Sequence, residues 1–337
     1  METQGLTDLQ VNGYAGVDFN DDAISADALD HALDTMRRAN VTTCLPTLIT
    51  ADEATLTARL AALDNAVANS RLGPQTVPGF HLEGPFLNRA PGYAGCHPPD
   101  AMIEPDPAIL ERLTKPLRRP ILLLTLAPER HGAMPLIAWA RTQGIAVAMG
   151  HTAADHATTA RAAAAGVTLS THLGNALPQP QPKFLNPLMA QLAQDQLYAS
   201  FIADGIHIPP EALKVLLRAK TPQRSILVTD ATAAAAAPPG LYHFAGMTIQ
   251  HTADGSVRIP GTTTLAGSSL TLDQAVRNLV TWNLADPATA LAMASTHPNA
   301  LLAPALTHHG IALPATEVTW TADLHPSPPR AGQFSAG

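Results

Sequence analysis

Short apolar runs alternate with longer amphipathic stretches from residue 7 to about residue 230. Each short run ends at glycine or a polar side chain, whereas each long stretch is rich in Ala and Leu at helical spacing. The short runs lie in DLQVNG, TTCLPTLIT, VPGFHLEGP, PILLLTLAP, IAVAMGHT, VTLSTHLGN, YASFIADGIH and SILVTDAT. Eight successive strand–helix units predict a (β/α)8 TIM-like barrel, because parallel strands need crossover connections. A doubly wound open sheet is the alternative, but it usually has fewer strands and often a glycine-rich phosphate turn.

The pattern changes at residue 237. Short alternating runs broken by Gly and Asp-Gly then predict a β-hairpin, and residues 269–284 and 286–303 each predict one helix, the second opened by Asp-Pro. The last residues, 324–337, predict a loose tail. We therefore expect a barrel over 1–236, a hairpin over 237–263, helices packed on the barrel over 264–303, and a strand remnant with a loose tail over 304–337.

Composition and charge narrow the function classes. Of 337 residues, 46% are apolar and 14% are charged, which is enough for one large core without global disorder. The net charge of -7 and the lack of a Lys/Arg cluster argue against nucleic acid or an anionic membrane as partner, and favour a small molecule. The two cysteines cannot form a disulfide framework, so we expect a cytoplasmic setting. No apolar run of about 18 residues predicts a membrane span, and no export signal is expected.

Polar side chains follow the predicted strands at the end where a barrel places its active site. In DLQVNG, Asp8, Gln10 and Asn12 alternate with apolar residues, so these three side chains share one face of the strand. Because the C-terminal ends of barrel strands meet at one mouth, we expect the polar residues there to be neighbours. They are Gln10 and Asn12 on the first strand, Glu83 on the third, His151 on the fifth, His172 on the sixth, Asp204 and His207 on the seventh, and Asp230 on the eighth.

One glutamate and two histidines form a ligand set that suits Zn²⁺ or a similar divalent ion, and Asp230 is left over as a free carboxylate. A single histidine is more often structural, and that interpretation stays open for His207 and for His97, each taken alone. His151 and His172 each follow an apolar run that needs no imidazole to end it. Glu83 would be a costly buried charge unless a cation or hydrogen bonds met it.

Several motifs then resemble one known family. GFHLEGPFLN, GYAGCH, GHTAAD, STHLGNAL, IADGIHI, LVTDATA and TLAGSSLTLDQAVRNLV occur in the order found in the N-acetylglucosamine-6-phosphate deacetylases of the amidohydrolase superfamily. The resemblance covers about residues 7 to 300. Each motif is weak alone, whereas the ordered set is specific.

The resemblance implies a role for each matching residue. Glu83, His151 and His172 match the metal ligands, and Asp230 matches the catalytic aspartate, with His97 placed to stabilise the oxyanion. It implies one divalent ion per chain, with Zn²⁺ as first choice and Fe²⁺, Mn²⁺ or Co²⁺ as alternatives, and a homodimer. The products would be acetate and a free amino sugar. The residues matching substrate-contacting segments are Cys96, His97, Asn175, Ala176, Lys183, Asp204, His207, Leu265, Ala266 and Gly267.

The sequence departs from the family pattern at three places. Gln10 and Asn12 stand where related enzymes carry a His-x-His pair for a second metal, and neutral amides are poor zinc ligands, so we expect a single metal. Lys183 stands where the family places a phosphate-binding arginine, often in the neighbouring subunit's site, and lysine lacks the bidentate fork. Only about half a dozen residues precede the first predicted barrel strand, so we expect a reduced β-sandwich appendage.

Two other functions stay open. One is an amidohydrolase acting on a different N-acyl substrate, such as an unphosphorylated sugar or a pathway intermediate. The other is a barrel that binds a ligand without catalysis, against which the costly cluster of Glu83, His151, His172 and Asp230 argues.

Overall fold

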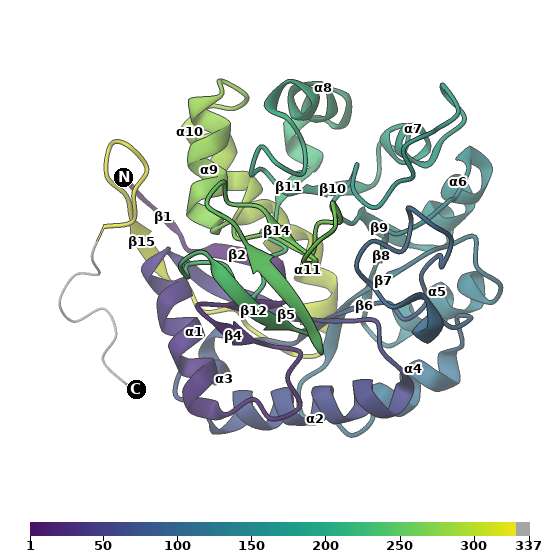
Figure 1. The fold of residues 1–337 in the computed structure, drawn as a ribbon, viewed down its shortest axis with the longest axis horizontal. Coiled ribbons are helices and arrows are strands. Elements are labelled where there is room, and N and C mark those ends of the chain that lie inside the picture. Colours follow the sequence, from purple (N-terminus) through teal and green to yellow (C-terminus); the bar gives the residue numbers. More distant parts are fainter. Residues whose placement is uncertain (328–337) are drawn as a thin grey trace.

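The computed structural model describes residues 1–327, which fold around a nearly closed barrel of eight parallel strands (Figure 1). The strands pair in chain order, and a parallel bridge between Val11 and Ala231 closes the ring between the first and last strands. This order confirms the predicted barrel and excludes the doubly wound alternative. The barrel strands are β2 (Leu6–Val11), β5 (Val41–Ile49), β6 (Phe80–Glu83), β7 (Ile121–Leu126), β8 (Ala146–Met149), β9 (Val167–Ser170), β10 (Tyr198–Phe201) and β11 (Ser225–Leu227).

Helices surround the barrel and bury its apolar outer face. Ser25 caps the start of helix α1, where its hydroxyl accepts a hydrogen bond from Ala28 N, and Asp52 caps the start of α2, where its carboxylate accepts from Thr55 N. The helices up to the last barrel strand are α1 (Ala26–Arg38), α2 (Glu53–Asn69), α3 (Gly73–Thr76), α4 (Pro107–Thr114), α5 (Ala133–Thr142), α6 (His156–Ala165), α7 (Pro187–Leu192) and α8 (Pro210–Lys220), with short 3-10 turns at Pro99–Ala101 and Pro222–Arg224.

Three further helices complete the shell: α9 (Leu272–Thr281), α10 (Pro287–Met293) and α11 (Thr296–His308). The prediction of one helix over 286–303 was wrong, since the chain breaks it at residues 294–295 and α11 runs on past residue 303. Pro298 favours a break here, because in an unbroken helix it would remove a backbone hydrogen bond and clash with the preceding turn, although α11 itself contains Pro304. In the first turn of α11 its missing N–H has no helical partner to lose.

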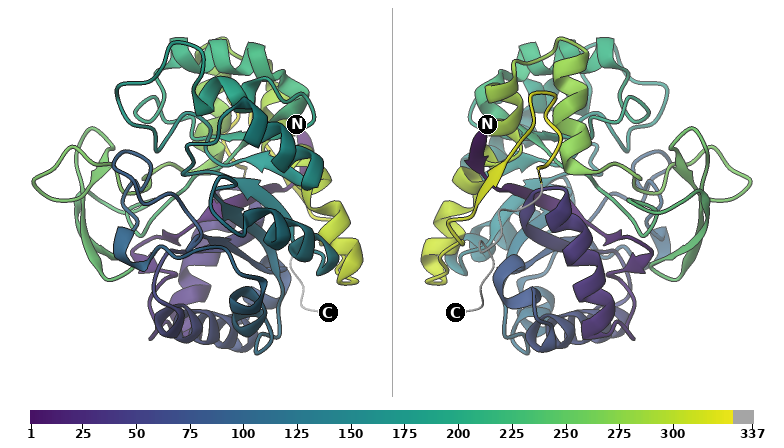
Figure 2. Two further views of the ribbon diagram at one scale, coloured as in Figure 1. Left: turned by 90° about the vertical axis from the view of Figure 1, so that its right-hand side faces the viewer. Right: turned by 90° about the vertical axis from the view of Figure 1, so that its left-hand side faces the viewer.

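An antiparallel sheet of three strands projects from the barrel (Figure 2). It comprises β12 (Gly240–Phe244), β13 (Met247–His251) and β14 (Val257–Arg258), so the predicted hairpin is present and gains a third short strand. Phe244, Ile249 and Val257 pack with Ile49 and Ala266 in an apolar cluster separate from the main core. Asp18, in the small sheet of β3 (Gly13–Tyr14) and β4 (Val17–Asp18), accepts a 2.7 Å hydrogen bond from Ala245 N at the hairpin turn.

The ends of the described chain lie side by side. Strand β1 (Glu2–Gln4) pairs antiparallel with β15 (Glu317–Thr319) in the C-terminal part. Residues 328–337 of the predicted loose tail lie outside the described residues.

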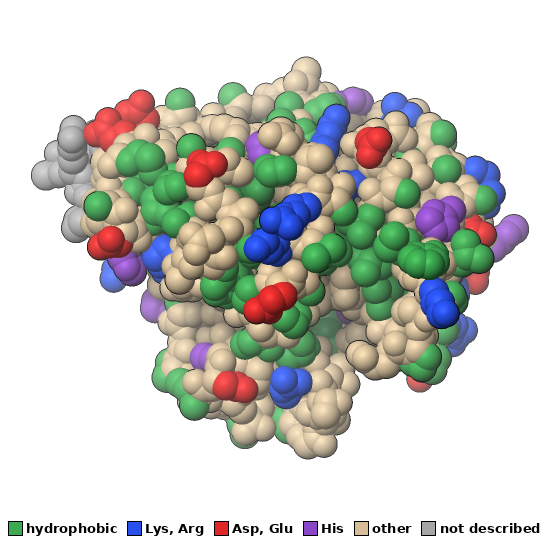
Figure 3. Space-filling view, turned by 90° about the horizontal axis from the view of Figure 1, so that it is seen from above, with side chains coloured by type: hydrophobic (Ala, Val, Ile, Leu, Met, Phe, Trp, Pro, Cys, Tyr) green, Lys and Arg blue, Asp and Glu red, His purple; other side chains and the backbone are tan. Residues whose placement is uncertain are grey.

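The outer surface carries mixed charges. Figure 3 shows one face, on which basic and acidic side chains are interspersed, with a hollow beside the lobe at the bottom of the view. Within residues 1–327, no helix is long and apolar enough to cross a bilayer.

Candidate active site

The predicted chemical residues meet at the C-terminal end of the barrel. Glu83 is the last residue of β6, and His151 and His172 each lie two residues after their strands. Asp230 follows β11 by three residues and is joined to the first strand by a 2.9 Å hydrogen bond from Asp230 N to Gln10 O. All four side chains line one cavity of about 540 Å³.

The backbone at this end of the barrel is strained. His151, His172 and Asp230 have φ values of +49°, +28° and +50°, in the left-handed region that non-glycine residues rarely adopt. Such strain persists only where surrounding contacts hold it, and it is concentrated at functional sites. The three turns aim polar side chains into the cavity instead of continuing the strands.

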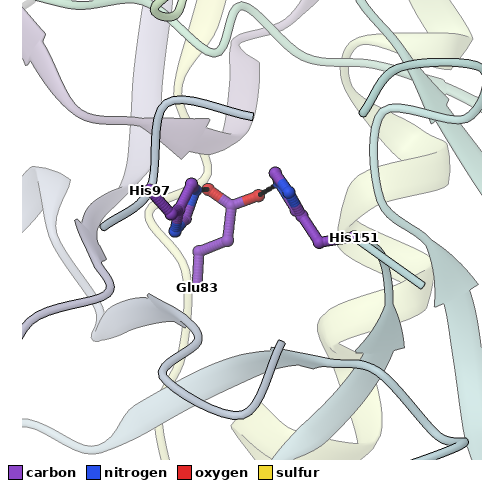
Figure 4. A group of neighbouring side chains, drawn as sticks. All are labelled: Glu83, His97 and His151. Carbon is purple, nitrogen blue, oxygen red and sulfur yellow. Dashed lines mark ion pairs between the residues drawn. The ribbon is translucent and has the colours of Figure 1, made fainter. Parts of the chain in front are cut away.

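Glu83 lies at the centre of three histidines. Its Oε1 is 2.9 Å from His172 Nε2 and 3.3 Å from His151 Nε2, and its Oε2 is 3.5 Å from His97 Nε2. Figure 4 shows His97 and His151 on opposite sides of the carboxylate. The ligand atoms of Glu83, His97 and His151 all lie within 4.8 Å of one another. The structure therefore brings together the predicted set of Glu83, His151 and His172, and adds His97 to it.

The outer nitrogens of two rings are held by hydrogen bonds. His151 Nδ1 donates to Tyr93 O at 2.7 Å, so in a neutral ring Nε2 carries no proton and presents its lone pair. His97 Nδ1 is 2.9 Å from Thr50 Oγ1, and that hydroxyl donates to Glu83 O. His97 Nε2 is then also a lone pair facing the carboxylate, and His151 Nε2 is buried without a hydrogen-bond partner. Lone pairs of nitrogen converging on a carboxylate fit a bound cation.

The pKa values of the cluster agree with this picture. Burial raises the pKa of Glu83, but its close contacts with the ring nitrogens of the three histidines outweigh burial and hold that pKa well below its usual range. Burial lowers the pKa of His97, so its ring is neutral near pH 7. Burial also disfavours the charged form of His172, yet its hydrogen bond to Glu83 raises its pKa above the usual value. Glu83 is thus ionised and His97 is neutral, the states in which these groups can bind a cation, whereas the raised pKa of His172 favours its charged form, whose proton a cation would displace.

Asp230 is held by the two amides of the first strand. Asn12 Nδ2 donates to Asp230 Oδ1 at 2.7 Å, and Gln10 Nε2 donates to the same oxygen at 3.2 Å. Within residues 1–327, both side-chain donors to this carboxylate go to Oδ1, which leaves Oδ2 without a side-chain donor. Burial and the negative charge of Glu83 raise the pKa of Asp230 to about 6, which suits an acid/base near neutral pH.

His81 lies next to the site on the same strand as Glu83, although it was not among the predicted site residues. His81 Nδ1 is 3.2 Å from Thr47 Oγ1 and its Nε2 is 2.8 Å from Thr125 Oγ1, so the ring connects β5, β6 and β7. Burial lowers the pKa of His81 to about 4, so the ring is neutral. Its signal in the sequence was the alternation of FHLE, which puts His81 on the same face as Glu83.

Most residues predicted to contact substrate line the cavity. These are Cys96, His97, Asn175, Ala176, His207, Leu265 and Gly267. Asp204 lies behind His207, whose Nδ1 donates to Asp204 Oδ2 at 2.6 Å. Ala266 is buried in the hairpin cluster, and Lys183 is exposed on the loop between β9 and α7, outside the lining. Burial raises the pKa of the Cys96 thiol, so Cys96 lines the cavity as a neutral thiol.

The cavity has further walls that sequence patterns did not single out. Phe244 comes from the hairpin, and Thr263 and Thr264 follow it. Ile49 ends β5, so the strand-end rule could have found it. Nothing local in the sequence places Phe244 here, because its position depends on how the hairpin folds over the barrel.

The fold is similar to those of solved deacetylases. The chain resembles a mutant N-acetyl-D-glucosamine-6-phosphate deacetylase from Mycobacterium smegmatis, solved in complex with N-acetyl-D-glucosamine-6-phosphate, at a TM-score of 0.84 and 29% identity over 96% of this chain and 84% of the other. The deacetylase from Pasteurella multocida has a TM-score of 0.83 and 26% identity over 96% and 83% of the two chains. Fold and site thus define a barrel of the amidohydrolase superfamily.

Sequence relatives give the family. The chain is 35% identical to N-acetylgalactosamine-6-phosphate deacetylase of Escherichia coli O157:H7 over 88% of its length and 76% of the relative. It is 32% identical to N-acetylglucosamine-6-phosphate deacetylase of Bacillus subtilis (strain 168) over 82% and 68%. No protein-family model matches the chain. The chain belongs to the N-acetylglucosamine-6-phosphate deacetylase family.

Proposed function

We propose that this enzyme hydrolyses the N-acetyl amide of N-acetylglucosamine 6-phosphate, giving glucosamine 6-phosphate and acetate. The observation that carries the proposal is the buried Glu83–histidine cluster facing Asp230 across one cavity, in a chain of this family. The same reaction on the 4-epimeric galactosamine sugar is a close variant, since one relative is named for that substrate.

Glu83, His151 and His172 would hold one divalent ion, with Zn²⁺ as our choice because imidazole and carboxylate suit it. When bound, the ion would lower the pKa of water and polarise the amide carbonyl. Thr50 fixes the ring of His97 beside Glu83 with the lone pair of Nε2 facing the carboxylate, so His97 is placed to join the ligand set. The predicted donation to the oxyanion would require the other tautomer, with the proton on Nε2. The single-metal assignment rests on Gln10 and Asn12, because neutral amides are poor zinc ligands; their N–H groups donate to Asp230.

Asp230 performs the proton transfers. Oδ2 accepts a proton from the attacking water as the new C–O bond forms at the carbonyl carbon. The same oxygen then gives that proton to the amide nitrogen as the C–N bond breaks, because an amine leaves only when it is protonated. The hydrogen bonds from Gln10 and Asn12 keep Oδ1 fixed, so that Oδ2 points at the reacting atoms.

Phosphate recognition involves a second subunit in this proposal. Among the described residues that line the cavity there is no Lys or Arg. Lys183 lies on an exposed loop beside Phe184 and Leu185, which are 71% and 77% exposed. An apolar loop of this kind suits association of two copies. We therefore propose that the enzyme is a homodimer in which Lys183 binds the substrate phosphate in the neighbouring subunit's site. We also propose that it works in the cytoplasm.

The same lining favours one alternative, hydrolysis of an unphosphorylated N-acyl sugar, because the cavity contributes no cationic side chain of its own. An acetate-release assay on N-acetylglucosamine and N-acetylgalactosamine, each with and without the 6-phosphate, separates the two functions. We expect kcat/KM to be higher for the phosphorylated sugars. Equal values would favour the alternative, and no acetate from any of the four would refute both.

A further inference from the structure

One carboxylate outside the cavity ties together the loops that carry the site. Glu129 follows β7, and its Oε1 accepts hydrogen bonds from Asn88 Nδ2 at 2.8 Å and from Ala153 N at 2.6 Å. Its Oε2 accepts from the hydroxyl of Thr152. Asn88 belongs to the loop after β6, and Thr152 and Ala153 to the loop after β8. Glu129 therefore joins three successive loops at the mouth of the barrel.

The joined loops hold His151 from two sides. Asn88 N donates to His151 O at 3.0 Å, which fixes the strained backbone of the histidine. Further along the same loop, Tyr93 O accepts from His151 Nδ1 at 2.7 Å, which fixes its ring. Thr152 and Ala153, both bonded to Glu129, are the next residues after His151. The backbone and the ring of His151 thus both depend on loops that Glu129 connects.

The role of Glu129 is not explained by ion pairing or by contact with the cavity. None of the ion pairs among residues 1–327 involves Glu129, and the neighbouring Arg130 pairs with Glu104 at 2.8 Å. Glu129 is half-buried and does not belong to the lining of the cavity in the described chain. Its partners are N–H and O–H donors, which constrain direction more than a single cation would.

We propose that Glu129 is a positioning residue, which orients His151 so that its Nε2 faces Glu83. The proposal rests on the proposed function only in taking His151 as a metal ligand. A partner that orients a ligating histidine typically contributes about 10–100-fold to metal affinity.

The test measures metal binding directly. Zinc affinity of the full-length protein is determined by competition with a chromophoric chelator, and the visible spectrum of the Co²⁺-loaded protein reports ligand geometry. Glu129→Ala should bind zinc about 10–100-fold more weakly and change the Co²⁺ spectrum. Glu129→Gln, which keeps an acceptor for the two N–H donors, should recover part of the affinity. Glu111→Ala, at an exposed glutamate of α4, is the matched control and should bind like the wild type.

A second pair of variants covers the case in which Glu129→Ala does not fold. Thr152→Val removes one donor to Glu129 and should weaken zinc binding, whereas Thr152→Ser keeps the hydroxyl and should not. Wild-type affinity and spectrum in both Glu129→Ala and Thr152→Val would overturn the proposal, as would a wild-type protein that binds no divalent ion. If wild type releases no acetate yet Glu129→Ala still weakens zinc binding, the proposed function fails and the positioning role stands.

Discussion

Asp8 offers a quantitative test of the polar interior. The side chain is fully buried, and burial raises its pKa to about 7, although hydrogen bonds from Thr229 and Gln10 act to lower that pKa. Thr229 Oγ1 lies 2.6 Å from Asp8 Oδ2 and also bonds to Gln10 O at 3.3 Å. A protonated Asp8 can donate to that hydroxyl while the hydroxyl donates to Gln10 O. Asparagine reproduces this arrangement, with its amide nitrogen as the donor.

The magnitude follows from the difference between the folded and unfolded pKa. The unfolded carboxyl titrates at 3.8 and the folded one at about 7, so the native state binds the extra proton between these values. Stability from Asp8 is present below pH 3.8 and is lost as the pH rises through 7. A shift of about three units corresponds to about 4 kcal/mol. The Asp8→Asn variant has no such proton to lose, so it should become the more stable protein at pH 8 by up to this amount.

Urea unfolding followed by circular dichroism from pH 4 to pH 8, with chelator present, measures this difference. The chelator removes metal binding, whose own pH dependence would otherwise contribute. All other titrating groups are shared by the two proteins, so the difference between their curves reports Asp8. Asp100→Asn, at an exposed carboxyl, is the control and should give a flat difference curve. Parallel stability curves for wild type and Asp8→Asn would refute the assignment of a neutral, buried Asp8.

Three further predictions concern the reaction. Asp230→Asn should lower acetate release by about 10²–10⁴-fold while metal is retained, and near-normal turnover would remove Asp230 as the acid/base. Metal analysis should find about one divalent ion per chain, because the neutral amides of Gln10 and Asn12 are poor zinc ligands. Chelation should abolish activity and one equivalent of Zn²⁺ should restore it, whereas two tightly bound ions would contradict the single-metal site. Lys183→Ala should raise KM for phosphorylated sugars by about 10–100-fold, which is the loss expected for one hydrogen bond to a charged group. KM for unphosphorylated sugars should not change, and an unchanged KM for the phosphorylated sugars would exclude a phosphate contact.

The barrel was predictable because its signals are local. Each strand is a short apolar run with a distinct end, and the rule that strand ends meet at one mouth predicts that Glu83, His151, His172 and Asp230 lie together. The split between α10 and α11 depends on Pro298, whose tolerance at a helix start and cost inside a helix cannot be distinguished until the start is known.

The rest of the site depends on contacts between distant segments. His97 reaches Glu83 because the loop after β6 folds back over the barrel, and that loop has no periodic pattern to reveal its path. Phe244 enters the cavity wall through the packing of the hairpin. The partner of Gln10 and Asn12 was also hidden, since only the closed ring places them against Asp230, more than two hundred positions away in the sequence.

The hairpin sheet has an apolar cluster of its own, separate from the barrel core, and it supplies Phe244 to the cavity wall. Segments with few contacts to the main core open and close as independent cooperative units. Substitutions in such a unit change local stability while the free energy of unfolding of the barrel stays nearly constant. Substitutions in the hairpin are therefore expected to change the shape of the cavity wall at little cost in the stability of the barrel.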